Sequence, residues 1–537
     1  MKSKRLIALL LVVTMVTMIF AGCNGGTKNE DVSKNGDDAQ NQDAESVYKK
    51  INVCIPTDPG TLAPWAGATG VGKGVVYASL YETLFVLEEL GGEMYPRIAS
   101  GYEQIDDLTY RISIYDNVYD AEGNHITADD VVFSYKTANE QGNMATFLSS
   151  YQDIAKVDDY TVDLTLNSTA LGGLMNTTTY VYIVDQEAYE ADPDGMANEP
   201  VSTGPYKVSE WVPGSSVILV KNDKYWQIPE LTTTYSLQNV DEIEYKVITE
   251  ASQMTIALQT GEVDFVADIA QADLEYFGEG SGFKVLSEDA ALTQSMLINC
   301  SDVSPTNDKL LRQSICYAID SQALVDGALD GVGSVCMTFG SPVYGDYLEK
   351  WDDEDYYNYN PEKAMELLEL SSYDGETLTI MSSMLSSHKM IAQIVQAYLL
   401  AVGINAEIVN YDDTLFSNYR WDPEQWDIQI ANKGSGDYVA NIWRYSFDQS
   451  FFGGQTQGFY TDETMQELLV RCLDQTTHNA QNMDAFHQYL KDICVGYGLI
   501  YGKSNYVYVD SIDTVVINPQ NAVIPGACTY AEDFSEK

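Results

Sequence analysis

Residues 116–135 read DNVYDAEGNHITADDVVFSY, a stretch that combines the signals of a turn and of a helix start. The preceding residues 109–114 alternate apolar and polar side chains, which predicts a strand. Gly123 can take the positive φ of a tight turn. Thr127 and Asp130 have the spacing of a capping box, in which each side chain accepts the backbone N–H of the other residue. The stretch therefore predicts a strand, a turn and a capped helix, which together form a local α/β unit.

The clearest amphipathic helix lies much later, where apolar side chains recur at helical spacing through residues 391–402. Gly403 is expected to end this helix, and residues 404–408 then alternate as a strand. Strands and helices are expected to alternate in this way along the whole chain, which favours an α/β fold over an all-β or all-helical fold. A chain of 537 residues is too long for one core, so about two or three domains are expected.

The sequence of residues 116–135 resembles a segment of the solute-binding proteins that serve peptide- and nickel-type ABC importers. In that family the segment reads D-G-x-P-[LV]-T-A-[DH]-D-V-V-[FY]-S-[YW]. Further short stretches resemble motifs of the same family, and they follow the family's order along the chain. They are YETL at 81–84, STGPYKV at 202–208, ALQTGEVD at 257–264, LRQSICYAID at 311–320 and NPEKA at 360–364. Each motif is short, and their common order carries the resemblance.

The resemblance implies an α/β fold of the periplasmic-binding-protein type II, with two lobes joined by a hinge and an extra subdomain in the first lobe. The implied boundaries are 48–301 with 504–537 for the first lobe, about 83–201 for its inserted subdomain, and 302–503 for the second lobe. Two chain crossovers, near residues 299–304 and 501–506, would form the hinge.

The N-terminus has the features of an export signal. Three basic residues precede the apolar run at 6–20, which would be about 22 Å long as a helix, shorter than a bilayer core of about 30 Å. Residues 1–22 are therefore expected to be a signal peptide. The cysteine of FAGC at 20–23 resembles a bacterial lipoprotein signal, so Cys23 would be acylated; ordinary secretion with an incidental cysteine is the alternative. Residues 23–47 have too little apolar surface to fold, which predicts a disordered tether to the extracytoplasmic face of the cell membrane.

Composition excludes several classes of partner. A formal net charge of −51 argues against binding to nucleic acid and against an adsorbed membrane face. The four histidines show no ligand spacing, so neither a metal nor a cofactor is expected. Besides Cys23 there are seven widely spaced cysteines without a Cys-x-x-Cys pair, which argues against a disulfide framework and leaves a single pair open. We expect a monomer.

Residues 67–74 nearly spell a P-loop, but Gly74 stands where the magnesium-binding hydroxyl belongs. We interpret them as a glycine-rich turn into a helix that extends to Thr83, with backbone N–H groups facing a cleft. The family resemblance places the ligand strand of the first lobe in the loop at residues 68–71.

A peptide receptor needs a cleft that closes, and a free amine in that cleft needs a carboxylate. In peptide binders of the family this carboxylate follows a strand and a Gly-Trp pair. Here the strand at 426–430 leads into ANKGSGDY, which lacks the tryptophan. With the family's spacing counted from Asp427, the amine-binding carboxylate would fall at Gly436. Asp437 therefore lies one residue further along the chain than the family pattern predicts. Either a one-residue insertion makes Asp437 the amine anchor, or Asp437 is structural and the ligand, such as an oligosaccharide, has no free N-terminus.

The candidate ligand-binding residues are Thr69, Gly70, Val71, Asp437, Tyr438 and Trp443. The aromatic residues Trp65, Tyr438 and Trp443 would line side-chain pockets or stack on sugar rings. A place in the core or at the rim of the cleft is the alternative for each of them.

The sequence therefore predicts a lipid-anchored receptor, not an enzyme, that captures oligopeptides by hinge closure for the permease and ATPase subunits of an ABC importer. One alternative keeps the fold and changes the ligand to an oligosaccharide or another small solute; nickel is less favoured without a histidine cluster. A surface hydrolase is a second alternative, disfavoured because neither G-x-S-x-G nor H-E-x-x-H occurs. A peptide sensor that does not transport is the third.

Overall fold

The computed structural model describes residues 48–66, 71–145, 147–354, 356–434, 436–450, 454–519 and 521–531, which belong to one compact unit. The predicted signal peptide (1–22), Cys23 and the tether (23–47) lie outside the described residues.

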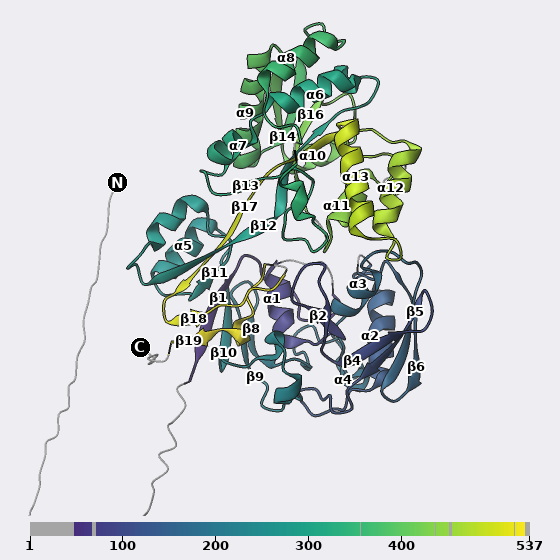
Figure 1. Cartoon of the computed structure of the whole chain (residues 1–537). Helices are drawn as coiled ribbons and strands as arrows, with labels where there is room; N and C mark the ends of the chain where they lie inside the picture. Colours follow the sequence, from purple (N-terminus) through teal and green to yellow (C-terminus); the bar gives the residue numbers. More distant parts are fainter. Residues whose placement is uncertain are drawn as a thin grey trace, which may run out of the picture. The chain divides into compact units, whose positions relative to one another are not determined.

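A mixed sheet of 11 strands runs through this unit, in the order β15-β14-β16-β12-β17-β11-β1-β10-β9-β8, with β13 paired to β17 (Figure 1). Its strands are β1 (Lys50–Ile55), β8 (Tyr206–Val212), β9 (Ser216–Lys221), β10 (Glu242–Val247), β11 (Phe265–Val266), β12 (Phe283–Ile298), β13 (Ser334–Val335), β14 (Leu378–Ser383), β15 (Ala406–Tyr411), β16 (Ile428–Lys433) and β17 (Gly496–Val509). Two small hairpin-like sheets are formed by β2 (Phe85–Leu87) with β3 (Met94–Pro96) and by β18 (Ile512–Thr514) with β19 (Thr529–Tyr530).

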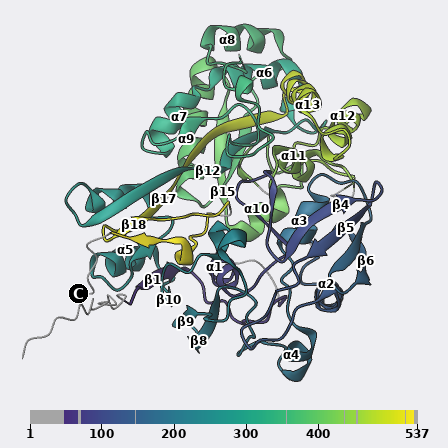
Figure 2. The same ribbon diagram turned by 60° about the horizontal axis from the view of Figure 1, so that its bottom comes forward.

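The long strands β12 and β17 connect the two ends of this sheet, as Figures 1 and 2 both show. They pair antiparallel from Phe283 opposite Val509 to Leu297 opposite Gly496. Between Asp289 and Thr293 the register shifts, so that residues 290–292 bulge opposite a single residue of β17. We propose this bulge as the hinge. It lies ahead of the predicted first crossover at 299–304 and opposite the start of the predicted second crossover at 501–506.

Apolar side chains form separate cores on the two sides of the bulge. The first core extends from Ile51 to Tyr245 and also contains Val523 and Cys528, so the C-terminal segment packs with the N-terminal half. The other large cores are built mainly from residues after the bulge, beginning with Met296. The end of β12 thus packs with the second half, although residues up to 301 were expected in the first lobe. The division into two lobes stays a proposal that these cores support.

The helices of the first half are α1 (Val71–Leu80), α2 (Ala128–Gln141), α3 (Gly173–Thr179), α4 (Gln186–Ala191) and α5 (Ala251–Gln259). The helices after β12 are α6 (Lys309–Ala318), α7 (Ser321–Ala328), α8 (Pro361–Leu370), α9 (Ser386–Val402), α10 (Asp413–Tyr419), α11 (Val439–Phe447), α12 (Glu463–Leu473) and α13 (Ala480–Ile493). Helix α9 ends at Gly403 with a φ of 97°, as predicted.

The stretch at 116–135 follows β5 of a separate four-stranded sheet and contains the start of α2, which packs against that sheet (Figure 1). Its strands, in order, are β4 (Ala99–Gln104), β5 (Thr109–Ile114), β7 (Thr161–Leu166) and β6 (Tyr151–Asp158). The predicted capping box is confirmed, since the Asp130 carboxylate accepts the Thr127 N–H at 2.8 Å while the Thr127 side chain caps α2. Gly123 takes a φ of 98°, as its place in the turn requires.

Candidate functional site

We call the residues before the β12 bulge the first half and those after it the second half. A cavity of about 390 Å³ is lined by residues of both halves. The first half contributes residues from three of its segments, among them Leu90, Phe147, Ser150, Asn176 and Tyr180. The second half contributes Tyr344, Asp437, Asn441 and Arg444, and the bulge of β12 contributes Ala291 and Leu292. The cavity therefore adjoins the segment at which the two halves are proposed to move.

Asp437 is a carboxylate in this cavity, and its side chain is only 2% exposed. Burial raises its pKa to about 6, because a carboxylate removed from water is harder to ionise. No residue that the structure describes donates a hydrogen bond to this carboxylate or forms an ion pair with it. Asp437 is thus a buried acid without a partner in the unliganded chain.

The N-terminus of α11, which follows Asp437, is capped by a different carboxylate. Asp346 accepts the N–H of Val439 at 2.6 Å and that of Ala440 at 3.1 Å. A structural aspartate is therefore present at this helix, and it is Asp346. This arrangement favours the interpretation of Asp437 as a ligand anchor over its interpretation as a structural residue.

The turn between β16 and α11 places Asp437 through two close approaches of the backbone. Gly436 has a φ of 72°, and a Cβ there would lie 3.1 Å from the Asn441 side chain. A Cβ on Gly434 would lie 2.7 Å from the side chain of Leu292 in the β12 bulge. The positive φ favours glycine at 436, and the close approach at Gly434 shows that the turn passes directly beside the proposed hinge.

Tyr438 lies at a contact between the halves and is absent from the described lining of the cavity. Its ring packs beside Gly91 and Gly172 of the first half, where an added Cβ would come within 2.9 and 3.2 Å of ring carbons. The hydroxyl of Tyr438 also donates to the sulfur of Met175 at 3.8 Å. This residue joins the two halves rather than lining a side-chain pocket.

The two tryptophan candidates are core residues. Trp443 has no exposed surface and packs against Trp351 and Phe486, with ring centroids 5.9 and 5.0 Å away. Trp65 is buried in the first core, where its indole N–H donates to the Tyr182 carbonyl at 2.9 Å. For both residues the structure supports the core alternative.

The predicted ligand strand lies largely outside the described residues, which include neither Thr69 nor Gly70. Val71 is the first residue of α1 rather than part of an extended segment. The helix ends at Leu80 and not at the predicted Thr83. It ends there because the backbone of the next residues bonds to other segments, with the Leu80 carbonyl accepting the Gly204 N–H at 2.9 Å.

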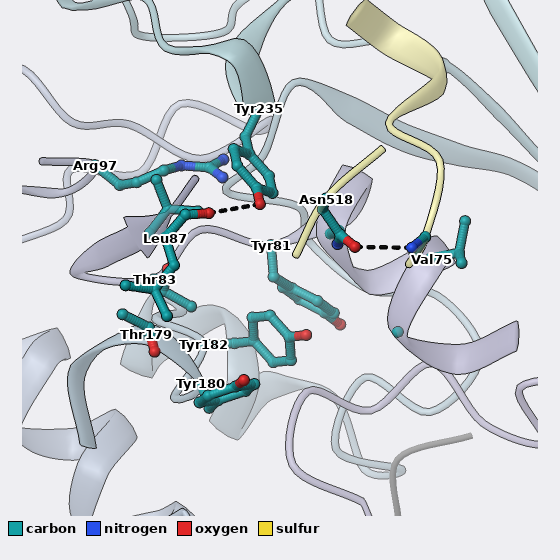
Figure 3. Close-up of a pocket in the computed structure, with 14 residues that line it drawn as sticks. Val75, Tyr81, Thr83, Leu87, Arg97, Thr179, Tyr180, Tyr182, Tyr235 and Asn518 are labelled. Carbon is teal, nitrogen blue, oxygen red and sulfur yellow. Dashed lines mark hydrogen bonds between the residues drawn. The ribbon is translucent and has the colours of Figure 1, made fainter. Parts of the chain in front are cut away.

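A second cavity, of about 270 Å³, lies in the first half beside α1 and is rich in tyrosine (Figure 3). Figure 3 shows Tyr81, Tyr180 and Tyr182 grouped on one side of it, with Tyr235 across from them. The hydroxyls of Tyr81 and Tyr235 donate to backbone carbonyls, each at 2.7 Å, so these polar ends are already satisfied. Burial raises the pKa of Tyr182 to about 12, which keeps it a neutral phenol. Because Tyr180 lines both cavities, the second adjoins the first.

The sequence did not reveal this tyrosine group, because its members come from the residue after α1, from the segment after α3 and from the segment before β10. Only the alternation of Tyr180 and Tyr182 could have signalled it.

In the part of the chain that the structure describes, no group of three or more His, Cys, Asp or Glu residues could hold a metal ion. The same part contains no helix that is both long and apolar enough to cross a bilayer. The seven cysteines after Cys23 are buried free thiols, and the sulfur atoms of Cys316 and Cys494 lie 3.5 Å apart.

Comparison with known proteins identifies similar chains. A family model described as bacterial extracellular solute-binding proteins, family 5 Middle, matches residues 93–455. The chain is 25% identical over 466 residues to the oligopeptide-binding protein AppA of Bacillus subtilis, covering 81% of each chain. It is 22% identical over 461 residues to heme-binding protein A of Haemophilus influenzae, covering 80% of this chain and 81% of the relative.

Among solved structures, the ABC transporter substrate binding protein CtaP of Listeria monocytogenes has a similar fold. The TM-score is 0.77 at 18% identity, covering 90% of this chain and 100% of CtaP. This likeness confirms the predicted α/β class of the fold.

Proposed function

The chain belongs to the bacterial extracellular solute-binding proteins of family 5, and on this premise we propose that it captures oligopeptides between its two lobes for an ABC importer. Solute binding follows from the family. The names of the relatives include both oligopeptide and heme binding, so the choice of ligand rests on the chemistry of the cavity.

Asp437 carries the choice of a peptide. An ionised carboxylate that is buried without a partner is costly, and a ligand ammonium would restore the lost interaction as a charge-assisted hydrogen bond. The hydroxyls of an oligosaccharide would donate hydrogen bonds without balancing the charge. The propionates of heme would be repelled by it. A free amine is the group that fits best.

The tyrosine-lined cavity suits the rest of such a ligand. Its aromatic faces offer apolar contact, and the hydroxyls of Tyr81 and Tyr235 are already satisfied by backbone carbonyls. A peptide held by its amine at Asp437 could therefore place side chains of several kinds there. This arrangement supports affinity for peptides without a narrow sequence preference.

The proposal includes the arrangement on the membrane. After removal of residues 1–22, acyl chains on Cys23 would hold the protein on the extracytoplasmic face, with residues 23–47 as the tether and the lobes as a monomer beyond it. The lobes, predicted as 48–301 with 504–537 and as 302–503, would close about the β12 bulge, with the end of β12 moving with the second lobe, in whose cores it packs. Closure would present the ligand to the permease, which the ATPase subunits drive. No catalytic step is part of the proposal.

Mass spectrometry of what co-purifies with residues 48–537 tests the ligand class, followed by calorimetry with peptide and glycan pools. We expect intact peptides to be released and to bind again. Binding of glycans without peptides, or a heme absorption band in the purified protein, would refute the peptide assignment. Cleavage of a bound peptide that persists through repurification would favour a hydrolase.

A further inference from the structure

Two of the cysteines that the structure describes are in contact with each other. The sulfur atoms of Cys316 and Cys494 lie 3.5 Å apart, and neither residue has any exposed surface. Four of the other thiols donate instead to backbone carbonyls, which are those of Ile298, Thr338, Asn482 and Ile524. The contact between the two sulfur atoms therefore distinguishes Cys316 and Cys494 from these other cysteines.

The backbone segments that carry the two sulfur atoms are already held together. Cys316 lies in α6, and Cys494 lies between the end of α13 and Gly496, where β17 begins. Arg312 of α6 donates to the Cys494 carbonyl at 2.9 Å and to the Ile493 carbonyl at 2.8 Å. Residues four apart share one face of a helix, so Cys316 lies on the same face of α6 as Arg312. These hydrogen bonds therefore keep the side chain of Cys316 beside Cys494.

Cys494 occupies a backbone position that favours glycine. It is the C-cap of α13, with a φ of 57° and a ψ of 51°, in the left-handed region that glycine commonly supplies at the end of a helix. A residue with a Cβ is strained there. In the reduced chain the Cys494 sulfur gains only a contact with another thiol, and a thiol is a weak hydrogen-bonding group. A covalent bond from this sulfur would explain why a cysteine stands at this position.

We infer that Cys316 and Cys494 form a disulfide in the exported protein, and that this bond links α6 to the start of β17. The inference rests on the extracellular location of the family and not on the choice of ligand, because disulfides form and persist outside the cytoplasm. A disulfide is about 2.05 Å long, so the two sulfur atoms have to approach each other by about 1.5 Å. Small rotations of the two side chains can produce such a shift.

The bond forms by exchange with the disulfide of an extracytoplasmic thiol–disulfide oxidoreductase. The thiolate of one cysteine attacks a sulfur of this carrier, which breaks the carrier's S–S bond, forms a mixed disulfide and releases the other carrier sulfur as a thiolate. The second cysteine then attacks its partner in the mixed disulfide, forming the bond between Cys316 and Cys494 and displacing the remaining carrier sulfur. The two cysteines lose two electrons, which reduce the carrier disulfide, and their two protons pass to the carrier thiols.

The exchange belongs to the folding of the exported chain. Both cysteines are part of the core of the second half, where a carrier protein cannot reach them once that core has closed. The disulfide is therefore a permanent structural bond and not a switch that the folded protein operates.

Thiol trapping followed by mass spectrometry tests the bond. The full chain is exported in a host that has an extracytoplasmic thiol–disulfide oxidoreductase, its free thiols are alkylated with N-ethylmaleimide in urea, and it is digested without a reductant. We expect a linked pair of peptides, one with Cys316 and the other with Cys494, two hydrogen atoms lighter than the two thiol peptides together. Cys300 and Cys336 should be alkylated. Alkylation of both Cys316 and Cys494 would overturn the inference, as would a bond from either of them to a different cysteine.

Thermal melting tests the structural role of the bond. Oxidised protein is compared with protein reduced by dithiothreitol in urea and refolded with the reductant present. Because the bond joins residues 178 apart in the sequence, reduction should lower Tm by about 3 °C or more. Equal Tm values for the two forms would overturn this role.

Two variants complete the melting experiment. In Cys316→Ala the same treatment should leave Tm unchanged, whereas Cys300→Ala, which removes a different buried thiol, should keep the full shift. If Cys316→Ala does not fold, Cys494→Gly takes its place, because glycine suits the left-handed backbone of that residue. A shift that persists without one of the two cysteines would assign it to another pair and overturn the inference.

Discussion

The carboxylate of Asp346 accepts the backbone N–H of Val439 at 2.6 Å, so the start of α11 is capped by Asp346 and not by Asp437. Two carboxylates lie near this helix terminus, and the fold uses only one of them to cap it. The other is buried in the cavity between the halves, without a partner among the described residues. An ionised Asp437 lowers the stability of the unliganded chain and forms no compensating contact within it, so a ligand best explains its presence.

Replacing Asp437 should therefore stabilise the unliganded protein. Burial raises the folded-state pKa from 3.8 to about 6, so the folded protein holds this proton more tightly than the unfolded chain does. The ionised group then lowers stability at a pH above 6, and this cost disappears below about pH 4. We expect Asp437→Asn to raise the free energy of unfolding by about 1–3 kcal/mol near pH 7.5, measured by urea denaturation.

The same pair of proteins should have nearly equal stability near pH 4, which serves as the internal control. A variant less stable than the original near pH 7.5 would mean that Asp437 has a stabilising partner, and its assignment as an unpaired anchor would be wrong.

Thr169 and Asp474 form a direct contact between the proposed lobes. The Thr169 hydroxyl donates to the Asp474 carboxylate at 2.7 Å, and the neighbouring Leu171 N–H donates to the Leu473 carbonyl at the same distance. If this contact holds the closed form, Thr169→Val should speed dissociation of a bound peptide about fivefold, because one hydrogen bond to a charged group is lost. Stopped-flow displacement measures the rate.

Thr169→Ser keeps the hydroxyl and is the matched control, which should dissociate at the original rate. An unchanged rate in Thr169→Val would show that this contact does not stabilise the closed form.

The capping box of α2 should contribute to stability and not to binding. Thr127 and Asp130 cap the helix, which is absent from the described linings of the Asp437 cavity and of the tyrosine-lined cavity. We expect Thr127→Ala to lower the free energy of unfolding by about 1 kcal/mol, as loss of an N-cap does, with peptide affinity unchanged. Thr127→Ser should restore the stability. A folded Thr127→Ala protein that no longer binds peptide would contradict this division of roles.

Features decided by neighbouring residues could be predicted from the sequence. The capping box at Thr127 depends on residues three apart, and the end of α9 depends on Gly403 alone. The end of α1 could not be predicted in the same way. Helical spacing continues to Thr83, whereas the helix ends at Leu80 because of a backbone bond to Gly204, which is distant in sequence.

The site was predicted in part, for the same physical reason. Asp437 could be nominated from its place after a strand, but the cap that Asp346 gives to α11 could not be predicted, because Asp346 lies far away in the sequence. A tryptophan such as Trp443 is as suitable for a core as for a pocket, and only its packing against Phe486 decides between them.

Whether Asp437 holds the amine of a bound peptide is decided by one ratio, the Kd of an N-acetylated peptide over that of the same peptide with a free amine. Calorimetry should give a large ratio for the original protein, since acetylation removes the charge that Asp437 binds. In Asp437→Asn the free-amine peptide should bind far more weakly and the acetylated one almost as before, so the ratio should fall towards unity. The same ratio in both proteins would mean that Asp437 is not the anchor.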